Sequence, residues 1–142
     1  MKARTALDQP AQPKLKSKDP VIHFEEGLVG FSEFKDFVLM ENSGLAPFWL
    51  LQSLESPSLG FLVLEASTLV PNYNALVPAR EWESLGLAGE RNARAFVIVV
   101  VGPTPEASTG NFQAPLLVNC GKMVGKQVIL TDSGFSVRQP LV

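Results

Sequence analysis

The chain has 142 residues, of which 46% are hydrophobic and 18% are charged, and its formal net charge at pH 7 is −2. This length suits one domain with a core that needs no disulfide or metal to be stable. No apolar run reaches the roughly 18–20 residues that a membrane-spanning helix requires. The N-terminus also lacks the layout of a signal peptide, and the single cysteine cannot form an internal disulfide. We therefore expect a cytoplasmic protein with no membrane partner.

Residues 1–20 differ in composition from the rest of the chain. They contain three prolines and almost no large apolar side chain, so they cannot bury enough surface to offset the entropy of ordering. Their five basic and two acidic residues give a net charge of +3, whereas residues 21–142 carry −5. We expect a flexible basic arm at residues 1–20 and one domain at residues 21–142. An acidic domain repels nucleic acid and favours a basic partner, although ordinary scatter of surface charge also produces such asymmetry.

Short runs of β-branched and aromatic residues, separated by Gly, Pro and Asn, predict strands along most of the domain. Residues 55–58 form a tight connection, so the runs on either side of it should pair antiparallel. The longest apolar run, residues 95–101, suits a buried strand. The predicted strands cover residues 21–24, 35–41, 48–54, 59–65, 94–101, 114–119, 126–131 and 135–138.

One short helix is predicted at residues 79–85. Pro78 suits its first turn, Trp82 and Leu85 lie on one face, and Gly86 suits the position after its end. Many short strands with turn residues between them are typical of a small barrel or sandwich. We expect a mainly β protein, with a single small antiparallel β-barrel-like domain and one short helix.

The sequence offers little for catalysis or metal binding. His23 is the only histidine and Cys120 the only cysteine, so an ordinary structural zinc site cannot form. A catalytic triad would need His23 as its base, but a half-buried or edge-strand histidine is the simpler interpretation. No phosphate-binding glycine motif occurs. We expect no catalytic residue, no cofactor and no metal.

A few side chains stand out as candidates for contacts with a partner. Most aromatic residues belong in the core, but two of them lie where a rim is expected, and partner sites often anchor on an aromatic ring. Two asparagines and one glutamine should bond to backbone groups of turns or strand edges. An arginine near the C-terminus should bind a carboxylate bidentately, within the fold or across an interface. The candidates are Phe31, Trp49, Asn111, Asn119, Gln127 and Arg138.

Several motifs occur in a fixed order along residues 21–142. They are Phe24-x-x-Gly27-Leu28-x-Gly30-Phe31, Phe48-Trp49-Leu50-Leu51-Gln52-Ser53-Leu54, Asn111-x-x-Ala114-Pro115-Leu116-Leu117-Val118-Asn119, Gly125-x-Gln127 and Ser136-x-Arg138-x-Pro140-Leu141. The ordered set resembles the FliW family of bacterial flagellar assembly factors.

This resemblance implies a barrel-like protein without catalytic activity. It implies two protein partners, flagellin and the RNA-binding translational regulator CsrA. Binding would relieve the repression of flagellin mRNA by CsrA through an allosteric effect that does not compete with RNA. We expect a monomer with no direct contact to nucleic acid.

Two other classes of function remain open from the residues alone. A small β-barrel enzyme that binds flavin or another ligand would need a cluster of Arg, Lys, Ser and Thr for a phosphate. A direct RNA-binding protein would need a basic sheet lined with aromatic residues, which the net charge of residues 21–142 disfavours.

Overall fold

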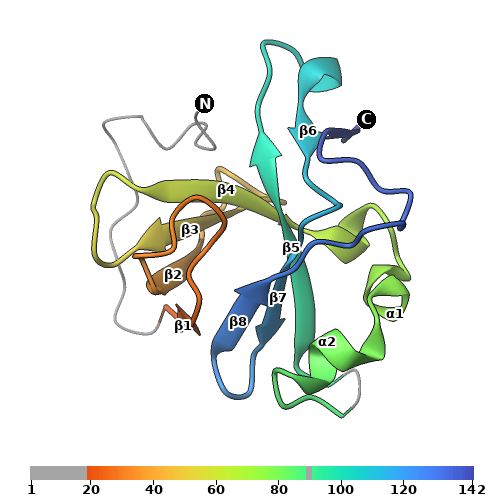
Figure 1. Cartoon of the computed structure of the whole chain (residues 1–142). Coiled ribbons are helices and arrows are strands. Elements are labelled where there is room, and N and C mark those ends of the chain that lie inside the picture. Colours follow the sequence, from red (N-terminus) through yellow and green to blue (C-terminus); the bar gives the residue numbers. More distant parts are fainter. Residues whose placement is uncertain (1–18, 89–90) are drawn as a thin grey trace.

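The computed structural model describes residues 19–88 and 91–142 (Figure 1). Most of the predicted arm, residues 1–18, lies outside the described residues, so its flexibility stays a prediction. The described residues are mainly β, with two short helices where one was predicted. Neither helix is long or apolar enough to cross a membrane, as judged over the residues that the structure describes.

The first four strands form an antiparallel meander. They are β1 (Val21–Phe24), β2 (Asp36–Glu41), β3 (Trp49–Ser53) and β4 (Gly60–Glu65). β1 pairs with β2, β2 with β3 and β3 with β4, all antiparallel. The predicted strands are confirmed here to within a residue or two at each end, and so is the antiparallel pairing across residues 55–58.

Two short helices follow β4 after the 3-10 turn η2 (Ala66–Thr68). They are α1 (Tyr73–Leu76) and α2 (Ala79–Glu83). α2 begins at Ala79 as predicted and ends at Glu83, two residues before the predicted end. Gly86 lies in the turn that closes the helix and has a φ of +84°, which glycine adopts without strain. Leu87 N donates to Trp82 O and Gly86 N donates to Glu83 O, the pair of bonds that closes a Schellman motif. α1 was not predicted, since its four residues are too few to show an apolar periodicity and its N-cap residue, Asn72, also suits a turn.

The rest of the chain supplies β5 (Ala93–Val100), η3 (Pro105–Ala107), β6 (Thr109–Gly110), β7 (Leu116–Asn119), β8 (Val124–Gln127) and β9 (Gln139–Pro140). Two predictions are wrong here. The strand expected at residues 126–131 begins two residues earlier and ends at Gln127. The strand expected at residues 135–138 is a turn and irregular chain, and pairing starts only at Gln139.

Seven of the strands close into a barrel. The order β4-β3-β2-β1-β8-β7-β5 returns to its start because β4 also pairs with β5. The expected mainly β, antiparallel barrel-like domain is confirmed, except that one pairing in the ring, β1 with β8, is parallel. We call this pairing the seam. β5 continues beyond the ring and pairs with β6, which pairs with β9 (Figure 1).

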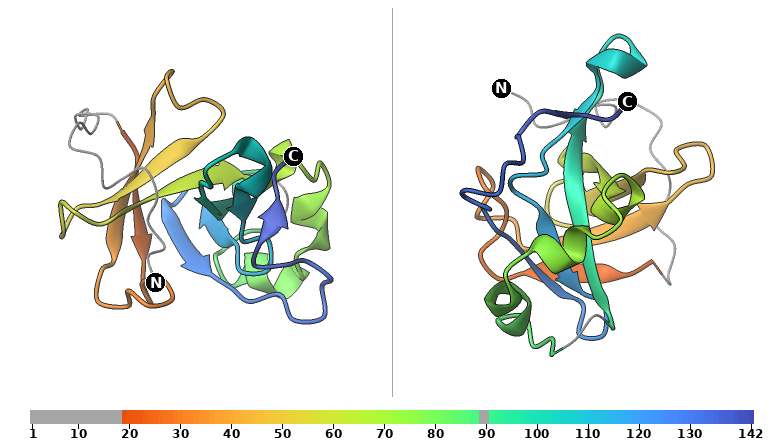
Figure 2. Two further views of the ribbon diagram at one scale, coloured as in Figure 1. Left: turned by 90° about the horizontal axis from the view of Figure 1, so that it is seen from above. Right: turned by 90° about the vertical axis from the view of Figure 1, so that its right-hand side faces the viewer.

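The barrel sheet carries a hydrophobic core on each side. The first core fills the barrel with side chains such as Phe24, Leu51, Val63 and Phe96. The second core lies outside β4, β5 and β7, where α1, α2 and the C-terminal segment cover the sheet. Figures 1 and 2 show both helices beside β5 and away from β2 and β3. The strands β4, β5 and β7 therefore contribute to both cores.

Candidate functional site

The strand registers define two ends of the barrel. Trp49, Glu65 and Arg94 lie at the strand ends beside the β7–β8 turn, residues 120–123, and we call this the hairpin end. The opposite end carries the connections at residues 25–35, 54–59 and 111–115, and we call it the loop end. The six candidate residues are divided between these two ends and the β9 segment, so they do not form one site.

At the loop end, Gln127 joins three segments of the chain. Its Nε2 donates to Ala114 O at 2.9 Å, and its Oε1 accepts from Val29 N at 2.9 Å. Asn111 Oδ1 accepts from Ala114 N at 3.0 Å, so Asn111 and Gln127 hold the same residue from two sides. The predicted bonding of these two amides to backbone groups is confirmed.

The outer surface of the loop end is partly apolar. The Phe31 ring is half-buried and packs edge-on against Phe61, with ring centroids 5.5 Å apart. Val29, beside it in the chain, is 65% exposed, and Ile129, two residues after Gln127, is 61% exposed. Exposed apolar side chains and a half-buried aromatic ring at one end of the barrel are suited to contact with another protein.

At the hairpin end, an arginine lies between two aromatic rings. The Arg94 guanidinium donates from Nε and Nη2 to both carboxylate oxygens of Glu65, at 3.0 and 2.9 Å. It also lies over the rings of Trp49 and Phe96, 5.2 and 4.8 Å from their centroids. The bond to Glu65 is the main cause that raises the pKa of Arg94, and the Cys120 side chain adds to it. Trp49 is thus half-buried beneath a fixed cation.

Asn119 also lies at the hairpin end, and it is buried. Its Oδ1 accepts from the backbone N–H groups of Gly121 and Lys122, and its Nδ2 donates to Leu85 O at 2.8 Å. The predicted role in a turn is confirmed. The side chain ties the β7–β8 turn to the segment after α2 and has little surface left for a partner.

Arg138 belongs to neither end. It is exposed, it precedes β9, and no ion pair of its guanidinium occurs within residues 19–88 and 91–142. The carboxylate partner that we considered within the fold is therefore not found there. Its neighbour Pro140, in the outermost strand of the sheet, has no N–H to donate.

A groove runs along the outside of the seam, with a volume of about 620 Å³. We call it the seam groove. Its walls are the end of β1 with the residues that follow, the end of α2 with its turn, and β8 with the turn before it. The charged groups that line it are His23, Glu25, Glu26, Glu83, Lys122 and Lys126.

His23 stands between two carboxylates at the rim of this groove. Its Nδ1 lies 2.7 Å from Asp36 Oδ1 and its Nε2 lies 3.0 Å from Glu25 Oε1. Only the protonated imidazole can donate from both nitrogens, so both contacts raise the pKa of His23. The contact with Asp36 has the larger effect, and the contact with Glu25 adds to it. This arrangement orients the ring, and among the described residues its hydrogen-bond partners are these two carboxylates and not a Ser, Thr or Cys side chain.

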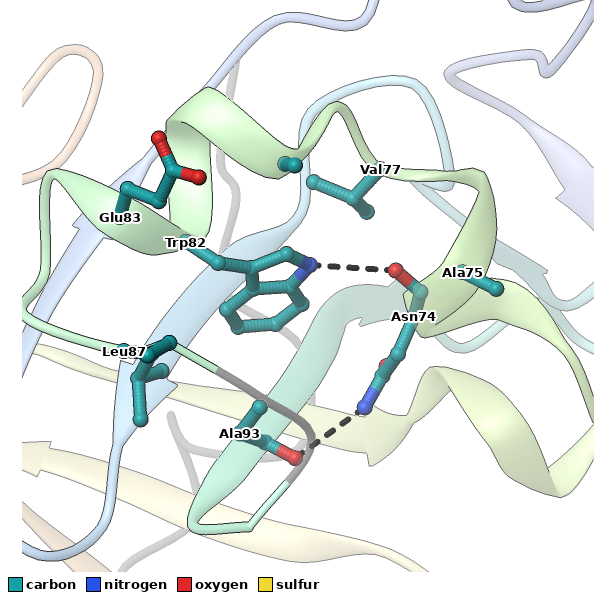
Figure 3. A pocket seen from close by; sticks show the side chains of 9 residues that line it. Asn74, Ala75, Val77, Trp82, Glu83, Leu87 and Ala93 are labelled. Atoms are coloured by element: carbon teal, nitrogen blue, oxygen red, sulfur yellow. Dashed lines mark hydrogen bonds between the residues drawn. The ribbon is translucent and has the colours of Figure 1, made fainter.

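A smaller pocket of about 250 Å³ lies between α1, α2 and the start of β5 (Figure 3). Trp82 Nε1 donates to Asn74 O at 3.1 Å, and Asn74 Nδ2 donates to Ala93 O at 3.1 Å. The remaining wall is mainly apolar, from residues such as Val77 and Leu87. Asn74 Oδ1 is buried without a partner, but it is also closed to solvent, so a ligand in the pocket could not reach it without a rearrangement.

The described residues hold no group of three or more His, Cys, Asp or Glu side chains arranged for a metal ion. The features that remain are surfaces: an apolar loop end, an aromatic and arginine hairpin end, and a charged groove on the seam. The fold places the chain among small closed β-barrels that carry two helices on one outer face.

Comparison with known proteins identifies the family. A family model described as FliW protein matches residues 11–141. The flagellar assembly factor FliW of Bdellovibrio bacteriovorus is 36% identical over 130 residues, which are 92% of this chain and 74% of that protein. The FliW of Geobacillus kaustophilus is 36% identical over 128 residues, 90% of this chain and 88% of that protein. A crystal structure of the flagellar assembly factor FliW superposes with a TM-score of 0.80 at 34% identity, over 97% of this chain and 94% of that one. The chain belongs to the FliW family.

Two features of the surface were not predicted from the sequence, namely the ion pair at the hairpin end and the seam groove. Glu65 and Arg94 are 29 positions apart, and no local pattern links them. The groove also gathers residues from three separate segments. Glu25 and Glu26 are adjacent in the chain, but no local pattern predicts that they line a groove together with the end of α2.

Proposed function

We propose that this protein is a non-enzymatic flagellar assembly factor that acts by binding two protein partners, flagellin and CsrA, in the cytoplasm. The observation that carries the proposal is the match along nearly the whole chain to proteins named flagellar assembly factor FliW. Binding of CsrA would lower its affinity for flagellin mRNA from a surface away from the RNA, which is an allosteric coupling. Flagellin would compete for the protein and release CsrA.

The surface of the domain supports this proposal. Residues 21–142 carry a net charge of −5, which suits a basic, RNA-binding partner and disfavours direct binding of RNA. Complementary charge speeds the encounter of two proteins and suppresses wrong partners. The half-buried rings of Phe31 and Trp49 are suited to anchor contacts at the two ends of the barrel.

The experiment is a calorimetric titration of the full chain with CsrA and with flagellin, at low and at physiological salt. We expect both to bind, flagellin to displace CsrA, and the CsrA affinity to fall as salt rises. CsrA in the complex should bind the flagellin mRNA leader more weakly than free CsrA does. The RNA should not compete directly with this protein for the same surface of CsrA. Binding of flagellin alone would remove the regulatory half of the proposal, and binding of neither would remove the whole.

A further inference from the structure

We infer that the seam groove is the docking site for a lysine- or arginine-bearing segment of a partner protein. The inference deepens the proposed function, because the RNA-binding partner named there is the one expected to supply such a segment. It also stands on the groove itself, so it can be tested without that partner.

The size and lining of the groove suit an inserted segment of chain. Its volume of about 620 Å³ is enough for several side chains. Val124 and Leu85 in its lining are half-buried and apolar. Lysine and arginine have long apolar stems that pack on such residues while their charged heads reach outward.

The charges that remain unpaired in the groove are mainly negative. Lys126 is neutralised within the fold, because its ammonium donates to Glu81 Oε1 at 2.7 Å and also contacts Ser84 Oγ. By contrast, Glu26 and Glu83 are exposed, and neither carboxylate has a hydrogen bond or an ion pair to any described residue.

The remaining lysine of the groove, Lys122, lies beside Gly86. Among the described residues, the groove lining therefore holds two carboxylates and one ammonium without an ion pair. A third carboxylate, that of Glu25, is held in place by His23. A segment that carries at least two basic side chains complements this arrangement.

The test uses two charge-matched variants of the full chain. Glu26→Lys combined with Glu83→Lys reverses both groove carboxylates. Glu41→Lys combined with Glu106→Lys makes the same change in net charge at exposed sites outside the groove. All four residues are exposed, so we expect each variant to fold, and circular dichroism and thermal melting check this.

The first probe is a hexalysine peptide, titrated into the 15N-labelled protein at low salt. We expect the amide signals of Val124, Gly125 and Gly86 to shift in the wild type and in the control variant, and not in the groove variant. Shifts that are spread over the whole acidic surface, or that persist equally in the groove variant, would overturn the inference.

The second probe is CsrA. If the wild type binds CsrA, the groove variant should bind at least about tenfold more weakly, mainly through a slower association, while the control variant stays within about twofold. Equal weakening of both variants would show that only net charge matters and would overturn the docking site. If the wild type does not bind CsrA but hexalysine maps to the groove, the regulatory half of the proposed function fails while the inference stands.

Discussion

At the scale of single residues, His23 is the clearest titrating group of the described surface. Its imidazole bridges Asp36 and Glu25, and both contacts favour the protonated form. The pKa is therefore raised above 6.5 in the folded protein, with the hydrogen bond to Asp36 as the largest cause. By linkage, the contacts of His23 contribute stability that is fully present below pH 6.5 and is lost as the pH rises through the raised pKa.

The chain has one histidine, so this prediction can be read from a single imidazole signal in an NMR titration. We expect a midpoint above 6.5 for the native protein. Asp36→Asn removes the larger contribution and should lower the midpoint by more than Glu25→Gln does. A midpoint at or below 6.5 in the native protein would contradict the geometry at this rim.

Gln127 is the second residue that carries a prediction. Its side chain satisfies Ala114 O, which belongs to a buried residue, and fixes Val29 at the loop end. Gln127→Ala leaves that carbonyl unpaired, so we expect the free energy of unfolding in urea to fall by about 1–2 kcal/mol.

Ile129→Ala is the matched control for Gln127→Ala, because Ile129 is two residues away and 61% exposed. It should change the free energy of unfolding by no more than about 0.5 kcal/mol. An equal loss in both variants would show that Gln127 does not hold the loop end together.

At this scale, the sequence predicts a side chain's role where the side chain forms hydrogen bonds with backbone groups a few residues away. Asn111 and Asn119 bond to N–H groups two or three residues ahead, a local geometry that their position in a turn already indicates. Prediction from the sequence failed for Arg94 and Arg138. The partner of Arg94 is set by the pairing of distant strands, and Arg138 lies in a segment that was wrongly assigned to a strand.

At the scale of elements, the seam between β1 and β8 is the critical pairing. It is short, with two residue pairs, and Gly125 allows the close approach. A Cβ built on Gly125 would lie 2.8 Å from the Phe24 ring and 2.9 Å from Leu117 O. Gly125→Ala should therefore lower the free energy of unfolding by about 1–3 kcal/mol through overpacking.

A double-mutant cycle with Phe24→Leu tests the cause of this loss. The smaller side chain makes room for the new methyl group, so Gly125→Ala should cost less in the Phe24→Leu background than in the native one. The same cost in both backgrounds would mean that the ring contact is not responsible. Urea unfolding of the four proteins gives all the required values.

The elements could be predicted where local chemistry decides them. β1 to β5 consist of apolar, often β-branched runs between turn residues, and the turn that closes α2 contains a glycine with a positive φ. The seam could not be predicted, because a parallel pairing between residues 101 positions apart leaves no pattern in sequence. β8 was misplaced for the same reason, since its hydrogen-bonding partners and not its apolar residues define it.

At the scale of the whole molecule, the barrel wall is shared by the two cores. Trp49 packs against the core inside the barrel, and Trp82 belongs to the core outside it. Because β4, β5 and β7 contribute to both, neither core can lose its packing without the other. We expect one cooperative unfolding transition for the described domain.

The two tryptophans make this prediction measurable, since they are the only two in the chain. Trp49→Phe leaves a reporter in the outer core, and Trp82→Phe leaves one at the inner core. For each variant, the urea midpoint from fluorescence should agree with its own midpoint from circular dichroism. For either variant, a fluorescence midpoint that differs from the circular dichroism midpoint would show that the two cores unfold separately.

The position of Pro140 also affects how the edge of the sheet can meet another protein chain. An outermost strand with free N–H groups can be extended by a strand from another chain, and further copies can follow. β9 ends the sheet, and Pro140 withholds one of the donors that such growth requires. Addition of a strand from another chain is therefore disfavoured at this edge, and contacts made there depend on side chains.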